Sequence, residues 1–84
     1  MSYSAHRRDA LDPDLPLTHR ASHARSCTVH VSEKYRVHRD VVLDRVLHES
    51  GVDLRSVQNV EDLVKAMETL ERIRWNGVGE TDVS

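Results

Sequence analysis

The chain has 84 residues, a formal net charge of −2 at pH 7, one cysteine and no phenylalanine. This length is typical of one small domain, and no apolar run approaches the ~20 residues that cross a bilayer. A single cysteine excludes an internal disulfide, and the first residues lack the apolar segment of a signal peptide. We therefore expect a cytoplasmic protein without membrane spans. The weak net charge is not typical of a dedicated nucleic-acid-binding protein.

Residues 1–26 contain few apolar side chains and follow neither a helical nor a strand period. Pro13 and Pro16 disfavour helix in the residues that precede them. We expect this segment to be a disordered arm containing His and Arg. Such an arm either stays solvated or becomes ordered on a partner or on phosphate groups.

Residues 27–31, Cys-Thr-Val-His-Val, are rich in β-branched side chains and predict a short β-strand. Its side chains would alternate between two faces, with Thr28 and His30 on one of them. A strand this short needs a partner strand, and the chain offers no second candidate. It would therefore pair with a second copy or with a larger protein, or lie on the helices as an extended segment.

A helix is expected over about residues 33–50. Ser32 can cap its first turn, and apolar side chains recur three and four residues apart in its second half. The run Val41-Val42-Leu43 is also compatible with a strand. Gly51 is a typical stop, because glycine readily adopts the left-handed conformation that ends many helices.

The clearest helix spans about residues 57–75. Asn59 can accept a hydrogen bond from the free amides of its first turn, and Gly77 can end it. The apolar side chains cover about half of the helix circumference, which is wider than the stripe that a surface helix needs. The helix is therefore either central to the core or exposes one flank to a partner.

Together these elements predict a mainly α fold, a small helical hairpin preceded by the β-prone segment and the arm. The single α-rich domain would span residues 27–77, and residues 78–84 would form a disordered acidic tail. Between the two helices, Val52, Leu54 and Val57 alternate with polar residues. This alternation predicts a connection that packs against the core.

His23, Cys27 and His30 have the spacing His-x3-Cys-x2-His, and these side chains are of the kinds that bind zinc. The spacing is not that of a standard zinc motif, and in a strand Cys27 and His30 would point to opposite faces. The sequence has no glycine-rich phosphate loop, and nothing near Cys27 indicates a nucleophile turn or an oxyanion hole. We therefore expect no metal, no cofactor and no enzymatic activity.

The order strand, helix, helix over residues 27–75 is similar in outline to the ribbon-helix-helix family. That resemblance implies a dimeric DNA-binding repressor or antitoxin whose paired strands enter the major groove. The first helix is longer than is usual in that family, and the ribbon lacks the side chains that read base edges best. In this alternative, the contacts to nucleic acid would come from the arm and the ribbon: Arg7, Arg8, Arg20, Arg25, Thr28 and His30.

The leading hypothesis is a small regulatory or adaptor protein that acts through protein–protein interaction. The wide apolar arc of the last helix favours docking of one helix flank on a larger protein or on a second copy. Tryptophan and methionine are favoured at such contacts, and the predicted partner-binding residues are Met67, Leu70, Ile73 and Trp75. A third hypothesis is an acidic inhibitor that masks a basic site, because residues 51–84 hold seven acidic against four basic side chains.

Overall fold

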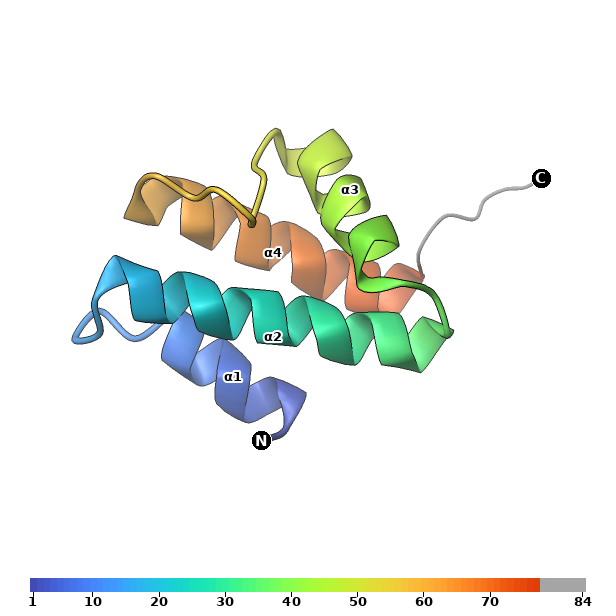
Figure 1. Cartoon of the computed structure of the whole chain (residues 1–84), viewed down its shortest axis with the longest axis horizontal. Coiled ribbons are helices and arrows are strands. Elements are labelled where there is room, and N and C mark those ends of the chain that lie inside the picture. The colour runs from blue at the N-terminus through green and yellow to red at the C-terminus, as the bar shows by residue number, and fades with distance from the viewer. Residues whose placement is uncertain (78–84) are drawn as a thin grey trace.

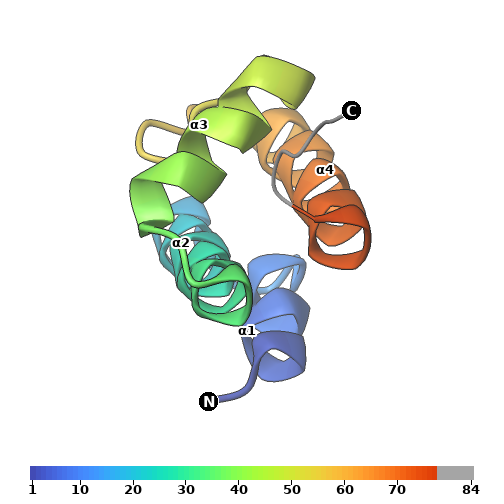
Figure 2. The ribbon, with the colours of Figure 1, turned by 90° about the vertical axis from the view of Figure 1, so that its right-hand side faces the viewer.

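The computed structural model describes residues 1–77, so the predicted tail over residues 78–84 lies outside the described residues. Helix α2 packs against each of the other three helices, and α3 also packs on α4. Helix α1 lies along one side of α2, with α4 and α3 on the other (Figure 1). Seen from the end, the helices are arranged in a ring (Figure 2), and their buried apolar side chains form one cluster. The predicted mainly α fold is confirmed, with these helices: α1 (Tyr3–Ala10), α2 (Leu17–Tyr35), α3 (Arg39–Ser50) and α4 (Val60–Asn76).

The prediction that residues 1–26 form a disordered arm is wrong, because they contain α1 and the first half of α2. Pro13 and Pro16 interrupt the helical structure only in the connection between α1 and α2. The buried side chain of Arg20 closes this connection by donating from Nε to the carbonyl oxygen of Ala10 at 2.9 Å. That bond satisfies a carbonyl in the last turn of α1, which has no partner within its own helix.

The predicted strand over residues 27–31 is also wrong, because this segment is the centre of α2. Burial of one face of α2 outweighs the local β preference of its β-branched residues. Thr28 and Ser32 donate their hydroxyl hydrogens to carbonyls three residues earlier, at 2.6 and 2.7 Å, which satisfies both groups inside the helix. The buried stripe follows helical spacing but consists mostly of small or polar residues: Arg20, Ala21, Ala24, Cys27, Thr28, Val31 and Ser32.

The helix predicted over residues 33–50 is in fact the end of α2 and all of α3. Arg36 ends α2 in the left-handed conformation, with φ 57°. The amide of Val37 then donates to the carbonyl of Ser32 at 3.0 Å, as in a Schellman turn. His38 caps α3, its Nδ1 accepting from a first-turn amide at 3.1 Å. This break allows α3 to cross back over the bundle (Figure 1).

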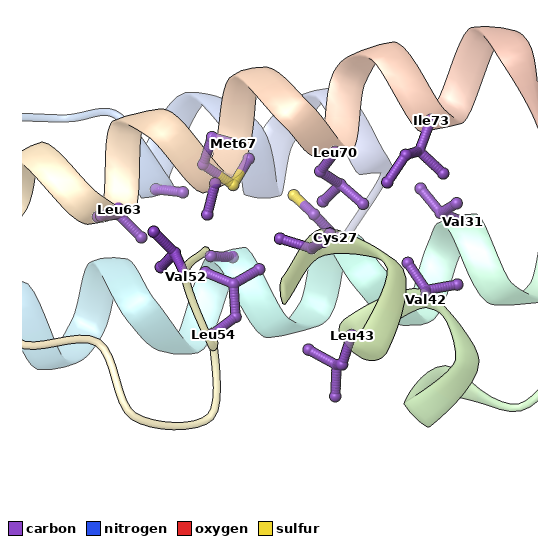
Figure 3. Close-up of a cluster of buried hydrophobic side chains, with 14 of the residues drawn as sticks. Cys27, Val31, Val42, Leu43, Val52, Leu54, Leu63, Met67, Leu70 and Ile73 are labelled. Carbon is purple, nitrogen blue, oxygen red and sulfur yellow. The ribbon is translucent and has the colours of Figure 1, made fainter. Parts of the chain in front are cut away.

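The core contains buried side chains from α1, α2, α3 and α4, and Cys27 and Val31 of α2 face the buried side of α4 (Figure 3). The connection between α3 and α4 adds Val52 and Leu54, both buried, which confirms the predicted packing of that segment. The predicted cap of α4 is confirmed, since the side chain of Asn59 accepts from a first-turn amide. Helix α4 contributes a buried stripe with bulkier apolar side chains than that of α2: Leu63, Ala66, Met67, Leu70 and Ile73.

Replacement of Arg36 by glycine is expected to raise the free energy of unfolding by about 0.5–1 kcal/mol, because left-handed backbone is costly for residues other than glycine. Urea denaturation followed by circular dichroism measures this change. The matched control is Glu33→Gly, an exposed position within α2, which is expected to lower stability by about 0.5–1 kcal/mol. A similar loss for Arg36→Gly would mean that one continuous helix passes through Arg36.

Candidate functional site

The three aromatic residues of the chain, Tyr3, Tyr35 and Trp75, are brought together by α1, α2 and α4, and we call them the aromatic cluster. Tyr3 Oη donates to one carboxylate oxygen of Glu71 at 2.7 Å, and Trp75 Nε1 donates to the other at 2.7 Å. Tyr35 Oη donates to the carbonyl oxygen of Arg74. The cluster therefore ties α1 and the end of α2 to the last turns of α4.

Two basic side chains lie beside the aromatic cluster. The guanidinium carbon of Arg74 is 4.3 Å from the ring centre of Tyr3 and 5.2 Å from that of Trp75. Lys34 Nζ is 5.5 Å from the ring centre of Trp75 and donates to the carbonyl oxygen of Arg74 at 3.0 Å. Cations at such distances are attracted to the negative face of an aromatic ring. The indole of Trp75 is thus held by the hydrogen bond to Glu71 and by attraction to the two cations.

Of the aromatic cluster, only Trp75 is open to solvent along most of its side chain. It is 68% exposed, whereas Tyr3 is buried and Tyr35 is half-buried. Successive helical residues turn by about 100°, so Trp75 lies on a different side of α4 from the core-facing stripe. The other predicted partner-binding residues belong to that stripe and are buried: Met67, Leu70 and Ile73.

Glu71 is the shared acceptor of the aromatic cluster. Partial burial acts to raise its pKa, but the hydrogen bonds from Tyr3 and Trp75 and the charges of Arg7 and Arg74 outweigh this effect. The pKa of Glu71 therefore lies below its ordinary value of 4.5. The carboxylate is ionised throughout the neutral range and remains an acceptor for both aromatic donors.

The predicted contacts to nucleic acid do not form one surface. Arg20 and Thr28 are buried and hydrogen-bonded within the bundle. Arg25 donates from Nη1 to the carbonyl oxygen of Leu54 at 3.2 Å. Because residues 27–31 are helical, the part of the chain that the structure describes has no ribbon. The similarity in outline to the ribbon-helix-helix family does not extend to this fold.

The remaining predicted contacts to nucleic acid are Arg7, Arg8 and His30. Arg7 Nε lies 3.6 Å from a carboxylate oxygen of Glu71, and Arg8 Nε lies 3.6 Å from one of Asp9. These carboxylates reduce the positive potential that attracts phosphate groups. His30 belongs instead to a group of histidines between α1 and α2.

That histidine group consists of His6 from α1 and His23 and His30 from α2. Nδ1 of His6 lies 3.0 Å from Nδ1 of His23, and the ring centre of His6 is 5.2 Å from that of His23 and 5.5 Å from that of His30. Burial first, and then the neighbouring histidines and the N-terminal amine, lowers the pKa of His6, against an opposing effect of Asp9. Sequence reasoning singled out His23 and His30 but missed His6, because only tertiary packing brings α1 to this place.

Cys27, the third residue of the predicted zinc spacing, is separate from the histidine group. It is fully buried, and its Sγ lies 3.8 Å from the carbonyl oxygen of Tyr3. Burial is the main cause that raises the pKa of the Cys27 thiol to about 12. The thiol therefore stays protonated at neutral pH, a state that is neither a good nucleophile nor a ready metal ligand.

A surface pocket of about 350 Å³ lies between α2, α3 and the connection to α4, with Arg25, Arg39 and Arg55 among its lining residues. Arg55 pairs with Asp40 and Asp44 at 3.6 and 2.9 Å, and with a third aspartate in the same connection. These carboxylates offset the positive charge that an anionic ligand would require. The pocket is therefore a weaker candidate site than the aromatic cluster.

Comparison with known proteins assigns no family to this chain. No protein-family model matches the sequence, and neither a curated protein nor a solved structure is significantly similar to it. Among the described helices, none is both long and apolar enough to cross a membrane.

Tyr3→Phe and Glu71→Gln are expected to destabilise the protein non-additively, with a coupling of about 0.5–1.5 kcal/mol at neutral pH. Folding lowers the pKa of Glu71, so this contribution is present above the ordinary carboxyl pKa and is lost as the pH falls through the lowered value. Urea unfolding of the single and double variants, at neutral pH and near pH 3, measures the coupling.

The matched control for this cycle is Tyr35→Phe combined with Glu71→Gln, which should be additive because Tyr35 bonds to the Arg74 carbonyl instead. Additive effects of Tyr3→Phe and Glu71→Gln at both pH values would contradict the docking of α1 on α4 through this bond.

Proposed function

We propose that the protein is a small non-enzymatic adaptor that binds a larger protein through the exposed face of Trp75. The observation that carries this proposal is a tryptophan that is 68% exposed and yet fixed by a 2.7 Å hydrogen bond to Glu71. A side chain already held in one orientation loses little conformational freedom on binding. Tryptophan is also enriched among the few residues that dominate the energy of protein interfaces.

The charges around Trp75 favour an acidic partner. Lys34 and Arg74 place two positive charges beside the indole, against the single negative charge of Glu71, which lies 4.0 Å from Arg74 and already accepts from Tyr3 and Trp75. A partner with an apolar pocket for the indole and Asp or Glu at its rim would match both features. In a symmetric dimer centred on Trp75, Lys34 and Arg74 of one copy would instead lie close to the same residues of the other copy. Their like charges would repel each other. We therefore favour a different protein over a second copy.

The buried stripe of α4 has a supporting role in this proposal. Met67, Leu70 and Ile73 anchor α4 in the core, and that anchoring fixes the direction in which Trp75 leaves the helix. The buried and protonated thiol of Cys27 supports the non-enzymatic part of the proposal, since it is the chain's only candidate for a cysteine nucleophile.

Trp75→Ala is expected to weaken partner binding by about 30-fold or more, because truncation of such a residue typically costs at least about 2 kcal/mol. The partner is first captured by a photoreactive amino acid at position 76, an exposed position next to the intact Trp75, and identified by mass spectrometry. It is then purified, and isothermal titration measures its affinity for each variant. The matched control is Leu47→Ala on α3, a second exposed apolar side chain, which should leave the affinity unchanged.

Because the proposed partner is acidic, its affinity should also fall as the salt concentration rises. Equal affinities of the wild type and Trp75→Ala would contradict the proposal. Self-association of the purified protein that Trp75→Ala abolishes would contradict it as well, since the surface would then belong to a homodimer.

A further inference from the structure

The histidine group lies on the seam between α1 and α2, where its rings are only partly exposed. His6 and Asp9 are one turn apart on α1, and His23 and His30 are two turns apart on α2. Residues at these spacings lie on one face of a helix, and here the two faces meet. The closest contact is between two ring nitrogens, Nδ1 of His6 and Nδ1 of His23, at 3.0 Å.

The short contact between the two Nδ1 atoms limits where the ring hydrogens can lie. Two Nδ1 atoms at 3.0 Å cannot both carry a hydrogen, so one donates and the other accepts. Nε2 of His23 lies 3.7 Å from a carboxylate oxygen of Asp9, which favours a hydrogen on that nitrogen. His23 then presents the lone pair of its Nδ1, and His6 presents a single hydrogen. If the hydrogen of His6 moves from Nδ1 to its own Nε2, both rings stay neutral and both Nδ1 lone pairs can be directed at one cation.

Although the sequence predicted no metal, we infer that His6 and His23 bind one divalent transition-metal ion of the zinc, nickel and copper class through their Nδ1 atoms. Zinc–nitrogen bonds of about 2.0–2.1 Å in tetrahedral geometry place two ligand nitrogens about 3.3 Å apart. The observed 3.0 Å needs only a small side-chain adjustment to reach that distance. Neutral imidazole suits these metals, whereas magnesium and calcium prefer oxygen ligands.

The neighbouring side chains have distinct roles in this site. The carboxylate of Asp9 lies 3.7 Å from Nε2 of His23, and its negative charge favours the tautomer that leaves Nδ1 free, which makes Asp9 a positioning residue. His30 packs beside His6, with the ring centres 5.5 Å apart, and supports that ring. Across residues 1–77, no three His, Cys, Asp or Glu side chains converge on one metal position. Water therefore completes the coordination of a two-nitrogen site.

Zinc binding to the full-length, tag-free protein tests this inference by isothermal titration with zinc chloride. We expect one ion per chain, with the affinity reduced tenfold or more in His6→Gln and in His23→Gln. Asp9→Asn should also weaken binding, because loss of an outer-shell partner typically costs about 10–100-fold in affinity. The matched control is His48→Gln, an exposed histidine on α3, which should bind zinc as the wild type does. Circular dichroism checks that each variant keeps its helices.

A second measurement uses the wild type alone and so does not depend on the folding of variants. Nitrogen-15 spectra of the histidine rings, recorded with and without zinc, identify the nitrogen that binds the metal. The inference requires Nδ1 of both His6 and His23 to shift, and thermal unfolding to move to higher temperature because the ion joins α1 to α2. Absence of binding, equal affinities in His6→Gln and the wild type, or coordination through Nε2 of His23 would each overturn it.

Discussion

The packing of the large apolar stripe of α4 on the small side chains of α2 is the interaction on which the rest of the structure depends. Met67 and Leu70 of α4 are fully buried, as are the small Ala24 and Cys27 of α2, and the two helices pack together. Burial of a large apolar side chain stabilises the fold by about 1.5–3 kcal/mol. With α2 held in this place, its C-terminal end reaches the last turn of α4 and its outer face meets α1.

Helix α1 connects the two candidate sites. Tyr3 reaches Glu71 on α4, while His6 reaches His23 on α2. An isolated helix of eight residues is not stable in water, so these contacts and the buried Ala10 hold α1 in its conformation. Tyr3 of α1 and Trp75 both donate to the carboxylate of Glu71. The surface around Trp75 therefore depends on α1, although α1 is distant in the sequence. Metal binding at the histidine pair would stabilise the docking of α1 on which this arrangement relies.

The sequence predicted α4, its cap at Asn59 and the stop at Gly51 because these depend on local chemistry. It predicted α2 wrongly because the buried face of that helix consists mostly of alanine, serine, threonine and cysteine, which produce little hydrophobic periodicity. The end of α2 at Arg36 was missed because a left-handed arginine has no sequence signal. Trp75 was singled out from the sequence, but the partnership of His6 with His23 arises only from tertiary packing.

Backbone amide hydrogen exchange, measured residue by residue by NMR, tests most directly the claim that α1 and α2 belong to one cooperative bundle. The account predicts that the amides of residues 27–31 exchange only with global unfolding, and that protection continues along α2 from its second turn to Tyr35. The amides in the last turn of α1 should also be protected. Unprotected exchange throughout residues 1–26, with alternating protection over residues 27–31, would contradict it, because the arm would then be disordered and the strand real.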